Sequence, residues 1–149
     1  MQIIQLLLGE HAVLLTACEH LERVSAHLEL ERLFEVARMV ESLMVQHAVN
    51  EDELVFDALP PQAAGVEDAL RSMRQDHDHI RAGFEQLYEC TSVAEARRHL
   101  AKVFEHSRDH FAIEERVMFA LAARTLGGKR LEELGAEWAR RRHLAPTTL

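Results

Sequence analysis

One pattern occurs twice in this chain: H-x-x-x-E, then a second acid, then a phenylalanine four residues later. It begins at His47 and again at His110, and its glutamates are Glu51 and Glu114. Residues four apart lie on the same face of an α-helix, one turn above each other. Each segment therefore predicts a helix that offers one nitrogen and one carboxylate oxygen on one face, and two such segments could hold two metal ions.

The segments around this pattern extend the repeat. An acid directly precedes a histidine at His11 and again at His77, and each histidine has an aliphatic residue three positions later. His77 lies 66 residues after His11, and His110 lies 63 residues after His47. Such near-constant offsets indicate an internal duplication. The chain is thus predicted to contain two copies of one helical hairpin, each with a lone histidine and then an H-x-x-x-E.

Helical periodicity runs through nearly the whole sequence, because apolar residues recur at spacings of three and four. Breaks are expected around 25–29, at Pro60-Pro61 and near Ser92, which could cap a following helix. Gly127-Gly128 should end the last long helix. The predicted elements are four long helices and one short amphipathic helix that packs on them, at 2–26, 29–58, 62–90, 93–123 and 129–143.

The spacing of the histidines supports one architecture. In an up-down-up-down bundle, two groups at the same height on consecutive helices are centred on the turn between them. The midpoints between consecutive histidines of the repeat fall at about 29, 62 and 93, on the turns already predicted. We therefore expect an all-α, up-down-up-down four-helix bundle with a short C-terminal fifth helix. One layer of it would hold the six candidate metal ligands: His11, His47, Glu51, His77, His110 and Glu114.

Composition limits what else the chain can contain. With 149 residues, 48% of them hydrophobic, we expect one domain over 1–149, made of the bundle at 2–123 and the amphipathic helix at 129–143. The net charge of −8 argues against a nucleic-acid partner. The basic triplet Arg140-Arg141-Arg142 is the exception, and we interpret it as a solvated helix end.

The cysteines and the N-terminus suggest where the protein resides. Cys18 and Cys90 stand alone without C-x-x-C spacing, which is typical of reduced thiols in a cytoplasmic protein. The apolar run Ile3–Leu8 follows no basic residue and leads straight into a predicted helix, so it does not resemble a signal peptide. No apolar stretch approaches the ~20 residues of a membrane span, and we expect no membrane partner.

The layer of histidines and glutamates resembles one known family. Over essentially the whole chain, the six residues at these spacings are similar to the hemerythrin-like, or HHE cation-binding, domain family. Carried over residue by residue, the resemblance implies that all six bind a non-haem di-iron centre with an oxo or hydroxo bridge. Glu51 and Glu114 would bridge the two irons.

Two positions depart from the oxygen-carrying hemerythrins. Those proteins have a second histidine one turn after the third-helix ligand and an aspartate five residues after the fourth-helix one. This chain has Arg81 and Glu115 there. Its ligand set more closely resembles those of the iron-centre repair-type and mycobacterial hemerythrin-like proteins, which points away from simple reversible oxygen carriage.

The donor set also limits the metal and its chemistry. Mixed imidazole and carboxylate donors suit Fe, Mn and Zn, whereas an all-oxygen site would favour Ca or Mg. We expect two Fe ions, with Zn or Mn less favoured. Four histidines and two shared carboxylates with a bridge fill at most five positions on each ion, which leaves room for a small ligand.

Three functions are compatible with these residues. The first is a di-iron protein that binds or reduces O2, NO or H2O2 in oxidative or nitrosative stress, or in oxygen sensing. The alternative is an iron-sensing or iron-buffering module without turnover. The third is a metal-free structural bundle. We favour the first, and the sequence does not identify a protein partner.

Residues next to the candidate ligands have two interpretations each. His106, one turn before His110, could support or join the centre or be a polar residue near the interior, whereas His79 should point away from it. Asp52 and Glu115 could orient ligand imidazoles, but surface charge is the favoured interpretation. Three aromatic residues should pack around the site as part of the core: Phe56, Phe111 and Phe119.

Overall fold

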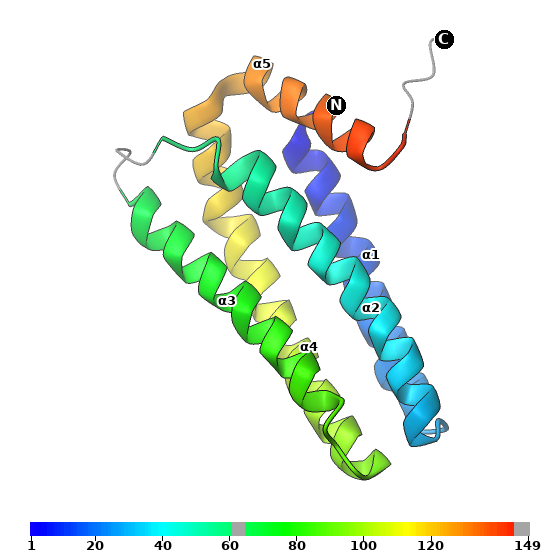
Figure 1. Cartoon of the computed structure of the whole chain (residues 1–149). Helices are drawn as coiled ribbons and strands as arrows, with labels where there is room; N and C mark the ends of the chain where they lie inside the picture. Colours follow the sequence, from blue (N-terminus) through cyan, green and yellow to red (C-terminus); the bar gives the residue numbers. More distant parts are fainter. Residues whose placement is uncertain (61–64, 145–149) are drawn as a thin grey trace.

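The computed structural model describes residues 1–60 and 65–144, which form an all-α structure with no strand in these two ranges. Four long helices run up and down as a bundle, and a further helix crosses one end of it (Figure 1). The prediction of an all-α, up-down-up-down bundle is therefore confirmed. The elements in order are α1 (Ile3–Ser25), α2 (Leu30–Glu51), η1 (Asp52–Phe56), α3 (Val66–Leu87), α4 (Val93–Arg116) and α5 (Met118–Arg141).

The buried side chains form two apolar clusters with a polar layer between them. On α1, Leu7 belongs to the cluster beneath α5 and Leu14 to the cluster toward the α1–α2 turn, and His11 lies between them. On α3, Met73 and Ile80 occupy the corresponding places. Burial of this apolar surface provides most of the stability of the bundle. The polar layer is thus enclosed by an apolar cluster on either side.

The helix ends mostly follow the predicted breaks. The Ser92 hydroxyl accepts a hydrogen bond from the Glu95 backbone N–H at 3.3 Å, so the predicted cap of α4 is confirmed. The described helix α3 begins at Val66, directly after Gly65, whose φ of 79° suits glycine. Part of the predicted start of that helix, and Pro61, lie outside the described residues.

The predicted second helix, 29–58, is not one regular helix. The α-helical part ends at Glu51, and η1 continues it as a π-helical turn in which the Asp57 N–H donates to the Asp52 carbonyl at 2.9 Å. Such turns contain one residue more than an α-helical turn and often occur at functional sites. This turn immediately follows the glutamate of the first H-x-x-x-E.

The predicted fourth helix, 93–123, has a break that the sequence analysis missed. Its regular part ends at Arg116, because Val117 has a φ of −107° and a ψ of −61°, and α5 begins at the next residue. The break predicted at Gly127-Gly128 is confirmed, since Gly127 has a φ of 71° and a ψ of 160°. The chain thereby leaves the direction of α4 and crosses the end of the bundle (Figure 1).

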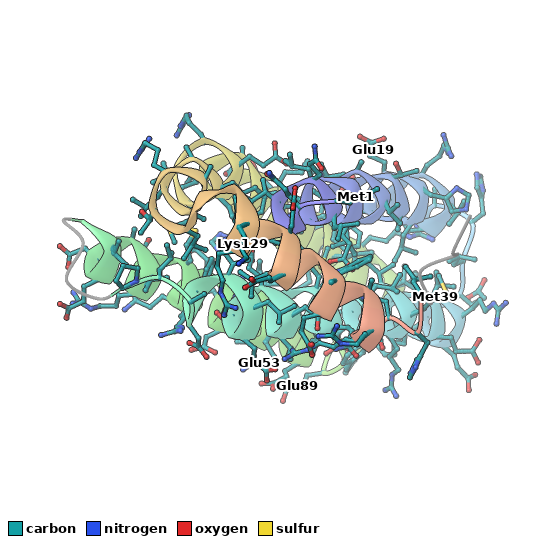
Figure 2. The ribbon with its side chains drawn as sticks, turned by 90° about the horizontal axis from the view of Figure 1, so that it is seen from above. Met1, Glu19, Met39, Glu53, Glu89 and Lys129 are labelled. Carbon is teal, nitrogen blue, oxygen red and sulfur yellow. The ribbon has the colours of Figure 1, made fainter. Side chains whose placement is uncertain are left out.

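The C-terminal segment packs on the bundle, as predicted for 129–143. Viewed from above, it crosses the bundle end from Lys129 onward (Figure 2). Its side chains that face the bundle are buried: Leu131, Leu134 and Trp138. At Gly135 a β-carbon would come within 2.2 Å of the Met1 carbonyl oxygen, so only glycine permits this close approach of α5 to the start of α1.

The basic triplet is not merely a solvated helix end, which corrects that interpretation. A guanidinium nitrogen of Arg141 lies 2.6 Å from a carboxylate oxygen of Glu53, and Arg142 forms an ion pair with Glu10. Both arginines are less than half exposed. The crossing of α5 over the bundle end brings these groups together, so ion pairs connect α5 to α1 and η1.

Two other features agree with the sequence. Cys18 and Cys90 are both buried and free. None of the helices in 1–60 and 65–144 has the length and apolar character that crossing a membrane would require.

Candidate metal centre

The six candidate ligands meet in the polar layer between the two apolar clusters. They come from α1, α2, α3 and α4, and none exposes more than 6% of its surface. They form two groups of possible metal donors, and within each group the donor atoms lie within 4.8 Å of one another. Both groups contain Glu51 and Glu114. We call the group with His11 and His47 the first half-site and the group with His77 and His110 the second half-site.

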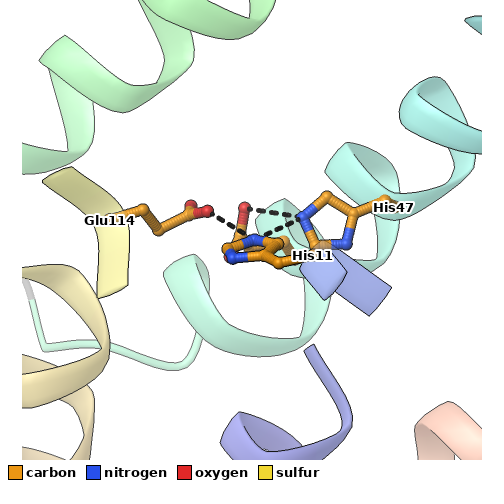
Figure 3. A group of neighbouring side chains, drawn as sticks. His11, His47 and Glu114 are labelled. Carbon is orange, nitrogen blue, oxygen red and sulfur yellow. Dashed lines mark hydrogen bonds and ion pairs between the residues drawn. The ribbon is translucent and has the colours of Figure 1, made fainter. Parts of the chain in front are cut away.

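The first half-site is closely packed. Nε2 of His11 lies 3.1 Å from Nε2 of His47 and 3.1 Å from Oε2 of Glu114. The His47 and Glu114 side chains therefore converge on the His11 ring (Figure 3). Two ligands at right angles on one ion, with bonds of about 2.1 Å, would be about 3 Å apart. The nitrogens of His11 and His47 therefore have the separation expected for neighbouring ligands of one metal ion.

The second half-site has the same ring arrangement with longer contacts. The imidazole centroids of His77 and His110 are 4.8 Å apart at 71°, and those of His11 and His47 are 4.8 Å apart at 63°. Nε2 of His77 lies 3.5 Å from Oε2 of Glu51. The two histidine pairs are thus near-copies, as the duplication predicts.

The two glutamates lie between the half-sites. Glu114 Oε2 is 3.1 Å from His11 Nε2 and 3.8 Å from His110 Nε2. Glu51 Oε2 is 3.8 Å from His47 Nε2 and 3.5 Å from His77 Nε2. Each carboxylate therefore contacts a histidine of both pairs, which is the arrangement a bridging ligand needs.

Outer carboxylates face the remaining ring nitrogens of the first half-site. Nδ1 of His11 donates a hydrogen bond to Glu115 at 2.8 Å, and Nδ1 of His47 donates to Glu10 at 3.0 Å. A proton held on Nδ1 leaves the lone pair of Nε2 free and also fixes the ring orientation. Both imidazoles are therefore held with a free nitrogen lone pair directed into the layer.

The second half-site has equivalent partners at longer distances. Nδ1 of His77 lies 3.4 Å from Oδ2 of Asp52, and Nδ1 of His110 lies 3.5 Å from Oδ2 of Asp76. Asp52 also contacts the Nε atom of Arg74 at 3.5 Å. The four outer contacts follow the same two-fold pattern as the repeat.

These contacts correct one prediction and add two residues to the outer carboxylates of the candidate site. Asp52 and Glu115 were expected to be surface charges, but they face candidate ligands and are only partly exposed, at 33% and 41%. Glu10 and Asp76 were not predicted to have this role. Their signal was the acid before each lone histidine, but each contacts a histidine on a neighbouring helix rather than the one that follows it.

Aromatic rings form the walls of the layer. Phe111 and Phe119 stack on His11, with centroids 4.2 Å and 5.4 Å away. Phe56 lies parallel to the ring of His77 at 6.1 Å. Phe56 and Phe119 are equivalent positions of the repeated pattern, so each lone histidine has one such ring. The prediction that these phenylalanines surround the site is confirmed.

Burial makes two of the imidazoles neutral at physiological pH. It lowers the pKa of His47, and it lowers that of His110 to about 4. A neutral imidazole is the form that binds metals. Burial also lowers the pKa of His11, but the nearby Glu114 and Glu115 carboxylates outweigh it and raise this pKa above its ordinary value.

Burying the two glutamates next to each other without a cation costs free energy. Burial and repulsion from Glu114 raise the pKa of Glu51 well above its ordinary value. Burial also raises the pKa of Glu114, but a proton on Glu51 and the adjacent His11 outweigh it, so the pKa of Glu114 is lowered. In the described part of the chain, the oxygens of both carboxylates lack hydrogen-bond partners, as do Nε2 of His77 and of His110. Burying such groups unpaired costs several kcal/mol, and a pair of cations would remove that cost.

A small cavity adjoins the layer. Its volume is about 30 Å³, and His47, His77 and His110 line one side of it. A cavity of roughly 10–15 Å³ already holds a water molecule and one of about 150 Å³ holds benzene, so this cavity suits a molecule of two or three atoms. The rest of the lining is mainly apolar, with one arginine: Met44, Val45, Ala48, Ile80, Arg81, Phe84 and Phe111.

The two other histidines of this region lie beside the layer. Nε2 of His106 is 3.5 Å from Oδ1 of Asp76, whose other oxygen faces His110. His106 therefore contacts a group that supports the centre, in agreement with one of its two predicted roles. His79 is exposed and belongs to neither half-site, as predicted.

A family model for the hemerythrin HHE cation-binding domain matches this chain over residues 2–122 and again over residues 68–144. Searches of curated proteins and of solved structures gave no match. The second match begins in the third helix and so overlaps the second half of the internal repeat. The matched range includes every residue of the polar layer.

Proposed function

This chain belongs to the hemerythrin HHE cation-binding family, and we propose that its polar layer binds two iron ions that handle a small ligand such as O2, NO or H2O2. His11 and His47 would bind one iron, His77 and His110 the other. Glu51 and Glu114 would bridge them. When bound, two irons supply reversible one-electron and two-electron chemistry. The protein residues hold the ions, orient the imidazoles and exclude water.

One observation carries this proposal: buried electron-pair donors converge in the layer, and several of them lack hydrogen-bond partners among the described residues. Nε2 of His11 and Nε2 of His47 face each other at 3.1 Å, and the Nδ1 atom of each is occupied by an outer carboxylate. Two lone pairs at this distance repel unless a proton or a metal ion lies between them. The unpartnered oxygens of Glu51 and Glu114 add two further donors to each half-site.

The donor set favours iron among the candidate metals. Each half-site offers two imidazole nitrogens and two carboxylate oxygens, which suits first-row transition metals rather than calcium or magnesium. Ferritin-like centres use four carboxylates and two histidines. With fewer carboxylates, this centre would favour the lower positive charge of ferrous over ferric iron, and we propose iron ahead of Zn or Mn.

The small cavity supports a diatomic or peroxide ligand over a larger substrate. Its volume of about 30 Å³ leaves no room for an organic molecule, and three candidate ligands line it. The apolar residues Ile80, Phe84 and Phe111 on the other sides would keep water away from a bound ligand. Hydroxylation of a large substrate is therefore disfavoured.

Iron sensing or buffering without turnover is the second candidate function. The observation that favours it is the same unpaired carboxylate pair, because iron binding would relieve a cost that the metal-free protein carries. Folding and metal binding are then coupled, which lets iron concentration control the folded population. We also propose that the protein works in a reducing compartment such as the cytosol, since both cysteines are buried free thiols.

The deciding experiment combines metal analysis with spectroscopy of the protein as isolated. Iron per chain is measured by elemental analysis, and absorption spectra are recorded before and after reduction and after exposure to O2, NO and H2O2. Two irons per chain with the bands of an oxo-bridged pair that respond to one of these ligands would support the redox function. Iron without any response would favour sensing or buffering, and protein purified from iron-replete cells without metal would contradict both.

A further inference from the structure

A second cluster of metal-type donors lies outside the polar layer. Asp76 and His79 are on α3, one turn apart, and His106 faces them from α4. One donor atom of each residue lies within 4.8 Å of the other two. Unlike the half-sites, this cluster is near the surface, because His79 is exposed and the other two residues are partly exposed.

The nitrogen of His106 that faces this cluster lacks a partner. Nε2 of His106 is buried and makes no hydrogen bond to any described residue, and the nearest carboxylate oxygen, Oδ1 of Asp76, is 3.5 Å away. The ring of His79 meets that of His106 edge to face, with centroids 6.0 Å apart at 73°. Both imidazoles therefore border the same space in front of Asp76.

We propose that Asp76, His79 and His106 form a third metal site, at the surface, which binds one divalent first-row transition-metal ion. This site is separate from the two half-sites, although it shares their outer carboxylate Asp76. The proposal goes beyond the function proposed above and does not depend on what the polar layer binds.

The donor chemistry favours this class of ion. Two imidazoles and one carboxylate suit Fe(II), Co(II), Ni(II), Cu(II) or Zn(II), and three protein ligands leave the remaining positions to water. Opposite ligands at about 2.1 Å from one ion are about 4.2 Å apart. The separation of up to 4.8 Å needs only a small rotation, which the exposed His79 side chain can make at little cost.

Asp76 can serve both sites at once because it uses a different oxygen for each. Oδ2 faces Nδ1 of His110, and Oδ1 faces His106. An ion on Oδ1 would draw negative charge away from Oδ2 and so weaken its contact with His110. Occupation of the surface site would therefore change the environment of the second half-site.

Cobalt binding tests the proposal. The protein as isolated is dialysed to equilibrium against CoCl2, and bound cobalt and iron are counted together by elemental analysis. The variants are His79→Ala and His106→Ala, and the matched control is His27→Ala, an exposed histidine in the α1–α2 turn. Circular dichroism verifies the fold, and His79→Ala decides the result if His106→Ala is misfolded.

The wild type and His27→Ala are expected to bind one more Co(II) per chain than His79→Ala and His106→Ala. The cobalt absorption bands in the visible region should lose the corresponding intensity. Equal Co(II) binding by wild type and His79→Ala would overturn the proposal, and would leave His106 and Asp76 as neighbouring side chains beside the buried layer. The test compares bound Co(II) per chain between the wild type and its variants. It can therefore be interpreted whether or not the polar layer contains iron.

Discussion

The two half-sites have the same ligand types, but the outer carboxylates that contact their imidazoles differ. In the first half-site the outer carboxylates are glutamates, at 2.8 Å and 3.0 Å from the imidazole nitrogens. In the second they are aspartates, at 3.4 Å and 3.5 Å. An aspartate side chain is one methylene shorter, so from a similar backbone position it reaches less far.

One aromatic neighbour adds to this difference, whereas second partners of the outer carboxylates do not, because Arg142, Arg74 and His106 face Glu10, Asp52 and Asp76 respectively. In the first half-site, Phe111 stacks on His11, whereas the equivalent position of the repeat is Ala48. A duplicated sequence can therefore keep its ligands identical while its surroundings diverge, and we expect the first half-site to bind metal more tightly.

The largest effect is expected from the groups that both half-sites share. Replacing Glu51 and Glu114 together with alanine should reduce bound iron from two ions per chain to none, because each half-site loses both carboxylates. Elemental analysis measures the loss, and circular dichroism should still show a helical protein, since the two apolar clusters are unchanged. Two metals per chain in the double variant would show that the bridge assignment is wrong.

Removing one histidine from each half-site compares the two directly. His11→Ala and His77→Ala, each combined with His79→Ala to remove the proposed surface site, should each retain one metal ion per chain. The ion left in His77→Ala occupies the first half-site and should bind at least about tenfold tighter, because outer carboxylates typically change metal affinity by 10–100-fold. Titration with Co(II) measures both affinities, and equal values or the reverse order would contradict the proposed difference.

The outer carboxylates provide a finer comparison. Glu115→Ala should weaken metal binding in the first half-site by roughly 10–100-fold, and Asp52→Ala should weaken the second half-site by less, because its contact is longer. Asp52→Glu should bring the second half-site closer to the first. Stepwise affinities from calorimetry test this order.

The control for this series is Glu19→Ala, which removes an exposed acid that lies outside the layer. It should leave both affinities unchanged. A fall as large as that of Glu115→Ala would mean that the net charge of the protein, rather than support of the imidazole, determines the affinity.

The smallest effect concerns stability of the metal-free protein. Because the pKa of Glu51 is raised above 4.5, the native state keeps a proton that the unfolded state releases as the pH rises. The stability contributed by Glu51 is therefore present at acid pH and lost as the pH rises through the raised pKa. Glu51→Gln should remove this loss of stability. The loss amounts to about 1.4 kcal/mol of unfolding free energy for each unit by which the pKa of Glu51 is raised.

Denaturant unfolding of chelated protein at several pH values tests this prediction. His110, with a pKa of about 4 in place of 6.5, acts in the opposite direction between these values, because the unfolded state binds more protons there. Both proteins contain His110, so the difference between them reports Glu51 together with its effect on Glu114. Parallel stability curves for the wild type and Glu51→Gln would contradict the raised pKa.

Much of the fold could be predicted because its signals are local. Apolar periodicity, Ser92 and Gly127 lie within the elements they define, and α1 and α4 begin within one residue of the predicted starts. The π-helical turn of η1 and the break at Val117 were missed. Neither has a glycine or proline, and both depend on how the chain packs around the buried layer.

The candidate site could be predicted as far as residue spacings along the helices determine it. The spacings predicted that all six candidate ligands share one layer, and the structure brings them together there, buried. That they bind metal stays a prediction. The surface cluster was less visible, because His79 and His106 lie 27 positions apart on different helices. The extent of the domain, taken as 1–149, also stays a prediction.

By itself, the sequence determined which residues repeat, which face of each helix is apolar and which donors share a height in the bundle. The tertiary structure alone decided the partner of each imidazole. Glu10 precedes His11 but bonds His47, and Glu115 follows Glu114 but bonds His11. Spacing along a helix fixes direction within that helix, whereas contact between helices depends on their relative rotation and distance, which follow from the packing of the whole core.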